Sequence, residues 1–136
     1  MKRHWMEFQE ERGVSPMSFW VHRPIPPSRI WIDATEFEPP LQSSVPGMGY
    51  PLFNVEIDGF TFFFASLDEI RACIRVLGTK VLPRTLDLSA QRETTMGPNG
   101  HWLSRLPAKT KSWKYREKAV AYLNDALADF QKILSA

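Results

Sequence analysis

Cysteine is almost absent from this sequence, and long apolar runs are missing altogether. The single cysteine, Cys73, cannot form a disulfide within the chain, so a secreted scaffold stapled by disulfides is excluded. No apolar run approaches the ~20 residues that a membrane-spanning helix needs. The segment Met1–Glu7 does not lead into the apolar core of a signal peptide. We therefore expect a soluble, cytoplasmic protein that makes no contact with a membrane.

Motifs that carry chemistry are missing as well. His4, His22 and His101 occur singly, without the His-x-x-x-His or Cys-x-x-Cys spacing of a metal site. The seven glycines never form the Gly-x-Gly-x-x-Gly loop that cradles phosphates. Cys73 falls on the inner side of a predicted amphipathic helix, where a buried, inert thiol is expected. We therefore predict no catalytic residue, no metal ion and no cofactor, and we favour a protein that is not an enzyme.

The composition is that of an ordinary globular domain. The 136 residues are 43% hydrophobic and 24% charged, which predicts a single domain, 1–136, with a core of its own. Eight of the eleven prolines lie in the first 51 residues, among aromatic side chains whose rings need burial. This mixture predicts two short strands, near residues 17–22 and 30–36, within proline-rich connections. Residues 1–16 are a candidate for a mobile segment.

A β-hairpin over residues 52–65 is the clearest local pattern. Asp58 and Gly59 separate two strand-like runs, and both central positions of a type I′ turn need a positive φ, which these residues tolerate. The two-residue turn fixes the register of the strands. The predicted pairs are Phe53 with Phe64, Asn54 with Phe63, Val55 with Phe62, Glu56 with Thr61, and Ile57 with Phe60. One face is apolar and must be covered, because a hairpin is not stable alone.

A helix over residues 66–77 is predicted to begin where the hairpin ends. Ser66 and Glu69 have the spacing of a capping box, in which the serine hydroxyl accepts from the Glu69 amide and the carboxylate reaches back. Gly78 supplies the stop signal. Between them the apolar residues recur at helical spacing, at Leu67, Ile70, Ile74 and Leu77.

A second, longer helix is predicted over residues 112–134, after an irregular loop over residues 89–111. Its apolar residues repeat every seven positions, at Trp113, Val120, Leu127 and Leu134. Position 116, where this stripe requires an apolar residue, is Arg116. We therefore expect the first helical turn to leave the core and to meet solvent or a partner. The expected fold is α+β: a small antiparallel β-sheet with helices 66–77 and 112–134 packed on one face.

Charge is distributed unevenly along the chain. Residues 1–70 carry 5 Lys or Arg and 10 Asp or Glu, whereas residues 71–136 carry 12 and 5. The two balances, −5 and +7, add to the net charge of +2. Such a distribution can steer an anionic partner, although the two halves can also neutralise one another across the fold.

Cations and aromatic rings occur together in residues 97–118. Six Lys or Arg lie in this stretch with Trp102, Trp113 and Tyr115, and with a single acid. Lysine and arginine neutralise phosphates or carboxylates, while aromatic side chains stack on bases or anchor protein interfaces. We therefore predict a non-catalytic interaction protein whose basic and aromatic surface, at about residues 84–118, binds an acidic protein surface or nucleic acid. The predicted binding residues are Arg84, Arg92, His101, Trp102, Arg105, Lys109, Lys111, Trp113, Lys114, Arg116 and Lys118.

Other interpretations of these residues stay open. Trp102 and the leucines beside it can pin the loop to the core while the lysines merely solvate the start of the helix. Alternatively, a small enzyme has its site around His101 in the 97–105 loop, which requires a carboxylate such as Asp87 within hydrogen-bond reach of the imidazole. Phe63 must be covered within the chain or by a partner, which leaves a homodimer open.

Overall fold

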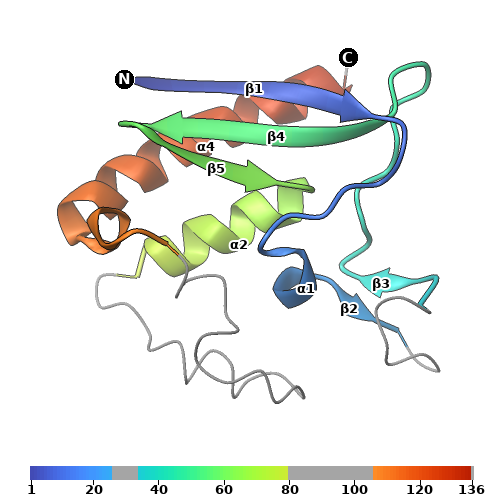
Figure 1. Cartoon of the computed structure of the whole chain (residues 1–136), viewed down its shortest axis with the longest axis horizontal. Helices are drawn as coiled ribbons and strands as arrows, with labels where there is room; N and C mark the ends of the chain where they lie inside the picture. Colours follow the sequence, from blue (N-terminus) through green and yellow to red (C-terminus); the bar gives the residue numbers. More distant parts are fainter. Residues whose placement is uncertain (26–33, 80–105, 136) are drawn as a thin grey trace.

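Two layers make up the fold, a small antiparallel sheet and two helices that cover one of its faces (Figure 1). The computed structural model describes residues 1–25, 34–79 and 106–135. The sheet has the strand order β1-β4-β5, with β1 at Lys2–Gln9, β4 at Tyr50–Ile57 and β5 at Phe60–Phe64. The two long helices are α2, Leu67–Leu77, and α4, Trp113–Ser135. The expected α+β fold is thereby confirmed.

Four short elements complete this part of the chain. A second, two-stranded sheet pairs β2, Arg23–Pro24, with β3, Phe37–Glu38. The other two are the single-turn helix α1, Ser18–Val21, and the 3-10 helix η3, Ala108–Lys111, which leads into α4.

The hairpin forms with the predicted register. All five cross-strand pairs expected between β4 and β5 are present, from Ile57 with Phe60 at the turn to Phe53 with Phe64. At the turn itself φ is +50° at Asp58 and +89° at Gly59, as a type I′ turn requires. The local chemistry of two residues therefore fixes which side chains face the helices.

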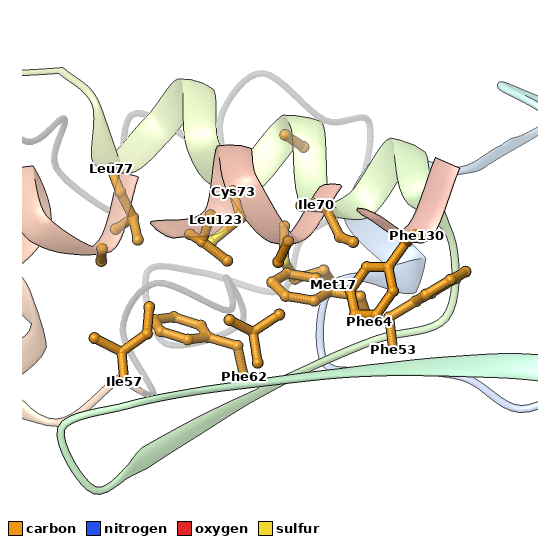
Figure 2. Close-up of a cluster of buried hydrophobic side chains, with 14 of the residues drawn as sticks. Met17, Phe53, Ile57, Phe62, Phe64, Ile70, Cys73, Leu77, Leu123 and Phe130 are labelled. Carbon is orange, nitrogen blue, oxygen red and sulfur yellow. The ribbon is translucent and has the colours of Figure 1, made fainter. Parts of the chain in front are cut away.

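The core lies between the sheet and the helices (Figure 2). Phe53 and Phe64 from the strands meet Ile70 from α2 and Phe130 from α4, and all four are at most 1% exposed. Cys73 is buried among them, and burial raises the pKa of its thiol, so the expectation of an inert cysteine fits its surroundings.

Helix α2 begins as predicted, but its capping carboxylate is used differently. The Ser66 hydroxyl accepts from the Glu69 amide at 3.2 Å, which is the expected N-cap. The Glu69 carboxylate does not return to Ser66; Oε1 accepts from the amide of Ala65 at 2.9 Å. The glutamate is fully buried, and its other contacts reach residues far away in the sequence.

The segment before residue 25 differs from expectation. The strand predicted over residues 17–22 is wrong, because this segment forms α1. Ser15 starts that turn: its hydroxyl accepts from the amide of Met17, and its carbonyl accepts from Ser18. Residues 34–36 are not a strand, and the rest of the strand expected over residues 30–36 lies outside the described residues.

Strand β1 was not predicted at all. It lies in the segment that we considered a candidate for mobility, and it pairs along its whole length with β4, from Lys2 opposite Ile57 to Gln9 opposite Tyr50. Most of its side chains are polar or charged, as is common on a strand at the edge of a sheet.

Candidate functional site

Six of the predicted binding residues lie within the described structure, at one end of the molecule. Lys109 and Lys111 belong to η3, while Trp113, Lys114, Arg116 and Lys118 occupy the first turns of α4. Figure 1 shows this end of α4 on the same side of the molecule as the turn between β4 and β5. The other predicted residues, Arg84, Arg92, His101, Trp102 and Arg105, lie outside the described residues, as does the alternative enzyme site around His101.

Arg116 does not face solvent, and the expectation that it leaves the core is wrong. Its side chain is buried, with 4% of the residue's surface exposed. Nε donates to the carbonyl of Lys111 at 2.9 Å, and Nη1 donates to the carbonyls of Leu77, at 3.1 Å, and of Thr79. The guanidinium therefore satisfies the carbonyl of Leu77, the last residue of α2, which a helix leaves without a partner, and that of Thr79 two residues beyond it.

Trp113 packs against the same arginine. Its ring lies 5.0 Å from the guanidinium carbon of Arg116, within the range of a cation–π contact, and the residue is half-buried. The buried Arg116 therefore holds the half-buried tryptophan in place.

Two of the lysines contact the tip of the hairpin. Lys118 Nζ lies 2.6 Å from a carboxylate oxygen of Asp58, and Lys109 Nζ donates to the backbone carbonyl of the same aspartate at 3.3 Å. Lys114 lies one helical turn before Lys118, on the same side of α4. We call the four residues Lys109, Lys111, Lys114 and Lys118 the lysine corner.

The carboxylate of Asp58 is held in its charged form by two neighbouring ammonium groups. Its hydrogen bonds to Lys118 and to the Met1 amine lower the pKa of Asp58 to about 2. Its negative charge is therefore fixed throughout the physiological range of pH. Lys111 and Lys114 make no ion pair with any residue that the structure describes.

Neutralisation between the two halves of the sequence is limited. Across the ranges 1–25, 34–79 and 106–135, two ion pairs join a Lys or Arg after residue 70 to an acid before it, and these are Arg71 with Asp68 and Lys118 with Asp58. The first is a local contact between helical neighbours three residues apart. The lysine corner thus retains more positive than negative charge.

A second polar cluster lies inside the molecule, where α1 meets the start of α2. His22 is fully buried: Nδ1 lies 2.8 Å from the carbonyl oxygen of Pro39, and Nε2 lies 3.1 Å from Glu69 Oε2. Glu69 also accepts from the hydroxyls of Ser15 and Ser18. The cluster ties α1, the segment after β3 and the first turn of α2 together.

The composition of this cluster matches a catalytic triad, but its geometry does not. In a triad the hydroxyl and the carboxylate contact opposite nitrogens of the imidazole. Here Ser66 Oγ, at 2.9 Å, and Glu69 Oε2 both contact Nε2 of His22, while Nδ1 faces the carbonyl of Pro39. No nitrogen remains to take the serine proton while the carboxylate orients the ring. The arrangement holds a charge pair and does not activate Ser66.

A pocket of about 130 Å³ lies against this cluster. The polar atoms of Ser18, His22 and Glu69 on its wall are already hydrogen-bonded to one another or to neighbouring residues. Its lining residues are Arg12, Gly13, Val14, Ser18, His22, Leu41, Gln42, Ala65 and Glu69.

The histidine and the glutamate stabilise each other's charge. Burial alone would lower the pKa of His22, but the hydrogen bonds to Glu69 and Pro39 and the charge of Glu69 outweigh it, so the pKa is raised. Burial would likewise raise the pKa of Glu69, but the hydrogen bonds from His22, Ser15 and Ala65 lower it. The charged pair is therefore favoured in the folded protein.

The stabilisation from this pair should decline as the pH rises above the ordinary pKa of histidine. Since the pKa of His22 is above 6.5 in the folded protein, its contribution is complete below pH 6.5 and is lost as pH rises through the folded value. Measured by urea unfolding between pH 5.5 and 9, the free energy of unfolding of wild type should exceed that of His22→Gln most at the acidic end. A difference between the two proteins that does not change with pH would contradict this assignment.

No cluster of three or more potential metal ligands occurs among the described residues. No helix in this part of the chain is long and apolar enough to cross a membrane. Comparison with known proteins returned no matching family, no matching curated protein and no matching solved structure.

Proposed function

We propose that this chain is a non-catalytic interaction protein that binds an acidic protein surface through the lysine corner. The observation that carries the proposal is an excess of positive charge at that end of the molecule. Among the residues that the structure describes at this end, the four lysines lie with the acids Asp58 and Glu117. The carboxylate of Asp58 contacts Lys118 and the Met1 amine, whereas Lys109 donates to the backbone carbonyl of Asp58, so this carboxylate pairs with only one of the four lysines.

The exposure of the lysines supports the proposal. Lys109, Lys114 and Lys118 are exposed on the surface, and Lys111 is half-buried. Charges in this position attract an oppositely charged partner and increase the association rate, although each contact contributes little to affinity. An acidic protein with several carboxylates at matching spacing is the partner that this charge selects.

The position of Trp113 favours a protein partner over nucleic acid. Proteins that bind single strands stack bases on free aromatic faces along a basic groove. One side of the Trp113 ring is already in contact with the guanidinium of Arg116. A half-buried tryptophan surrounded by lysines suits a protein interface, where tryptophan is a frequent anchor and charged residues form the rim around it.

Binding to defined anionic probes tests the proposal. A fluorescent peptide of twelve glutamates and a DNA strand of the same charge would be titrated with wild type, with Lys111→Gln/Lys114→Gln and with Lys132→Gln. Lys132 lies near the far end of the same helix and is exposed, so it is the matched control. We expect the double variant to bind the peptide roughly three- to tenfold more weakly, since two exposed ion pairs are lost.

Each alternative outcome has a distinct meaning. Equal weakening by Lys132→Gln, or none by the double variant, would overturn the role of the lysine corner. Tighter binding to DNA than to the peptide, with an affinity that falls steeply as salt is added, would identify nucleic acid as the partner instead.

A further inference from the structure

The sheet face that the helices leave uncovered carries a row of three residues across the strands. Trp5 in β1, Asn54 in β4 and Phe63 in β5 are directly paired in the register of the sheet. Their neighbours along the strands, such as Phe53 and Val55, point into the core, so the row lies on the opposite face. Phe63 is 54% exposed, the largest exposure among the phenylalanines of the hairpin.

The middle residue of the row has an unused hydrogen-bond donor. Asn54 is only 2% exposed, and its side-chain Nδ2 has no hydrogen-bond partner. A buried amide without an acceptor destabilises a protein, and most such groups in folded proteins are satisfied. Because this amide is already covered within the chain, the part of the row that a partner can reach is the half-buried ring of Trp5 and the exposed ring of Phe63.

Opposite charges flank the row along β1. The guanidinium carbon of Arg3 lies 4.9 Å from the Trp5 ring, and the indole Nε1 donates to the carboxylate of Glu7 at 3.0 Å. Arg3 is also paired with Glu56 on the neighbouring strand. These contacts hold Arg3, Trp5 and Glu7 in one arrangement before any partner arrives, which lowers the entropic cost of binding.

We propose that this face is an interface between two copies of the chain. A two-fold axis along the row Trp5–Asn54–Phe63 lays each residue of the row against the same residue of the second copy. The axis also places Arg3 of each copy opposite Glu7 of the other, because these residues lie on either side of Trp5 on one strand. Two sheets that pack face to face, about 10 Å apart, bring such facing side chains into contact.

The second copy covers the Phe63 ring that the single chain leaves exposed. The two Phe63 rings pack on one another across the two-fold axis. The face is self-complementary in charge, carrying Arg3 together with Glu7 and Glu56, so neither a purely acidic nor a purely basic partner fits it as well. The interface shares no residue with the lysine corner and does not depend on the proposed function.

Sedimentation equilibrium over a range of protein concentrations tests this interface. The mass of wild type should rise from that of one chain towards that of two. Phe63→Lys should weaken dimerisation roughly tenfold or more, since it places a charge at the centre of the buried patch. Met48→Lys is the matched control, because Met48 is 57% exposed but lies outside the strands of this face.

Charge reversal tests the two-fold arrangement itself. Glu7→Arg sets arginines of the two copies against each other and should weaken the dimer, while Arg3→Glu/Glu7→Arg should recover most of the loss. Glu7 is exposed, so these variants should keep the fold, which far-ultraviolet circular dichroism would verify. A wild-type protein that stays monomeric at all concentrations, equal weakening by Met48→Lys, or no recovery in the double variant would overturn the proposal.

Discussion

Replacing Glu69 by glutamine should lower the free energy of unfolding by about 3–5 kcal/mol, the cost of removing one partner of a buried ion pair. The Glu69 carboxylate accepts from the hydroxyls of Ser15 and Ser18, from the amide of Ala65 and from the imidazole of His22. Glutamine has one acceptor oxygen and places an amide NH₂ group against donors. His22 is left buried without its counter-charge.

Asp68→Asn is the matched control for this experiment. Asp68 precedes Glu69 in the same helical turn, but its ion pair with Arg71 is exposed, so its loss should change stability by at most about 1 kcal/mol. Urea unfolding of the three proteins at pH 6 measures both effects. Equal losses in the two variants would show that the buried pair has no special part in holding α1 to α2.

Arg116→Met should destabilise the protein by about 3 kcal/mol, because charged hydrogen bonds to buried carbonyls are lost while the carbonyls remain. The affected groups are the carbonyls of Leu77 and Thr79 at the end of α2, and of Lys111 before α4. Arg116→Lys should recover only part of the loss, since an ammonium group lacks the planar fork that reaches these carbonyls together.

Lys114→Met provides the matched comparison for Arg116. Both residues lie in the first turns of α4, but Lys114 is exposed and makes no ion pair within the described part of the chain, so its replacement should change stability by about 0.5 kcal/mol or less. Chemical unfolding of the variants distinguishes the two positions. If Arg116→Met were as stable as Lys114→Met, the hydrogen bonds from Arg116 to the end of α2 would make no net contribution to the free energy of unfolding.

Local chemistry made the hairpin and helix α2 predictable. Asp58-Gly59 determines both the turn and the register, and Ser66 with Gly78 marks the ends of the helix. Strand β1 carries no comparable signal, because its polar alternation also occurs in exposed loops. Its pairing partner, β4, begins more than 40 residues after β1 ends, at Tyr50.

The buried polar contacts could not be predicted from the sequence either, because the residues that form them are far apart in it. His22 and Glu69 are 47 residues apart, and Glu69 has a sufficient local explanation as the last residue of a capping box. Arg116 stands out in the sequence as an exception to an apolar stripe, but two of the carbonyls that accept from it, those of Leu77 and Thr79, are 39 and 37 residues away in the sequence. A buried guanidinium can occupy an apolar position when backbone acceptors surround it.

The most direct measurement is a titration of the ¹⁵N-labelled protein with the twelve-glutamate peptide, followed by amide and indole NMR shifts. If the lysine corner is the docking surface, the largest shifts should occur at residues 109–118 and at the Trp113 indole, and they should saturate. The amides around Trp5 and His22 should move little. Shifts of equal size over the whole molecule, or none at residues 109–118, would contradict the assignment.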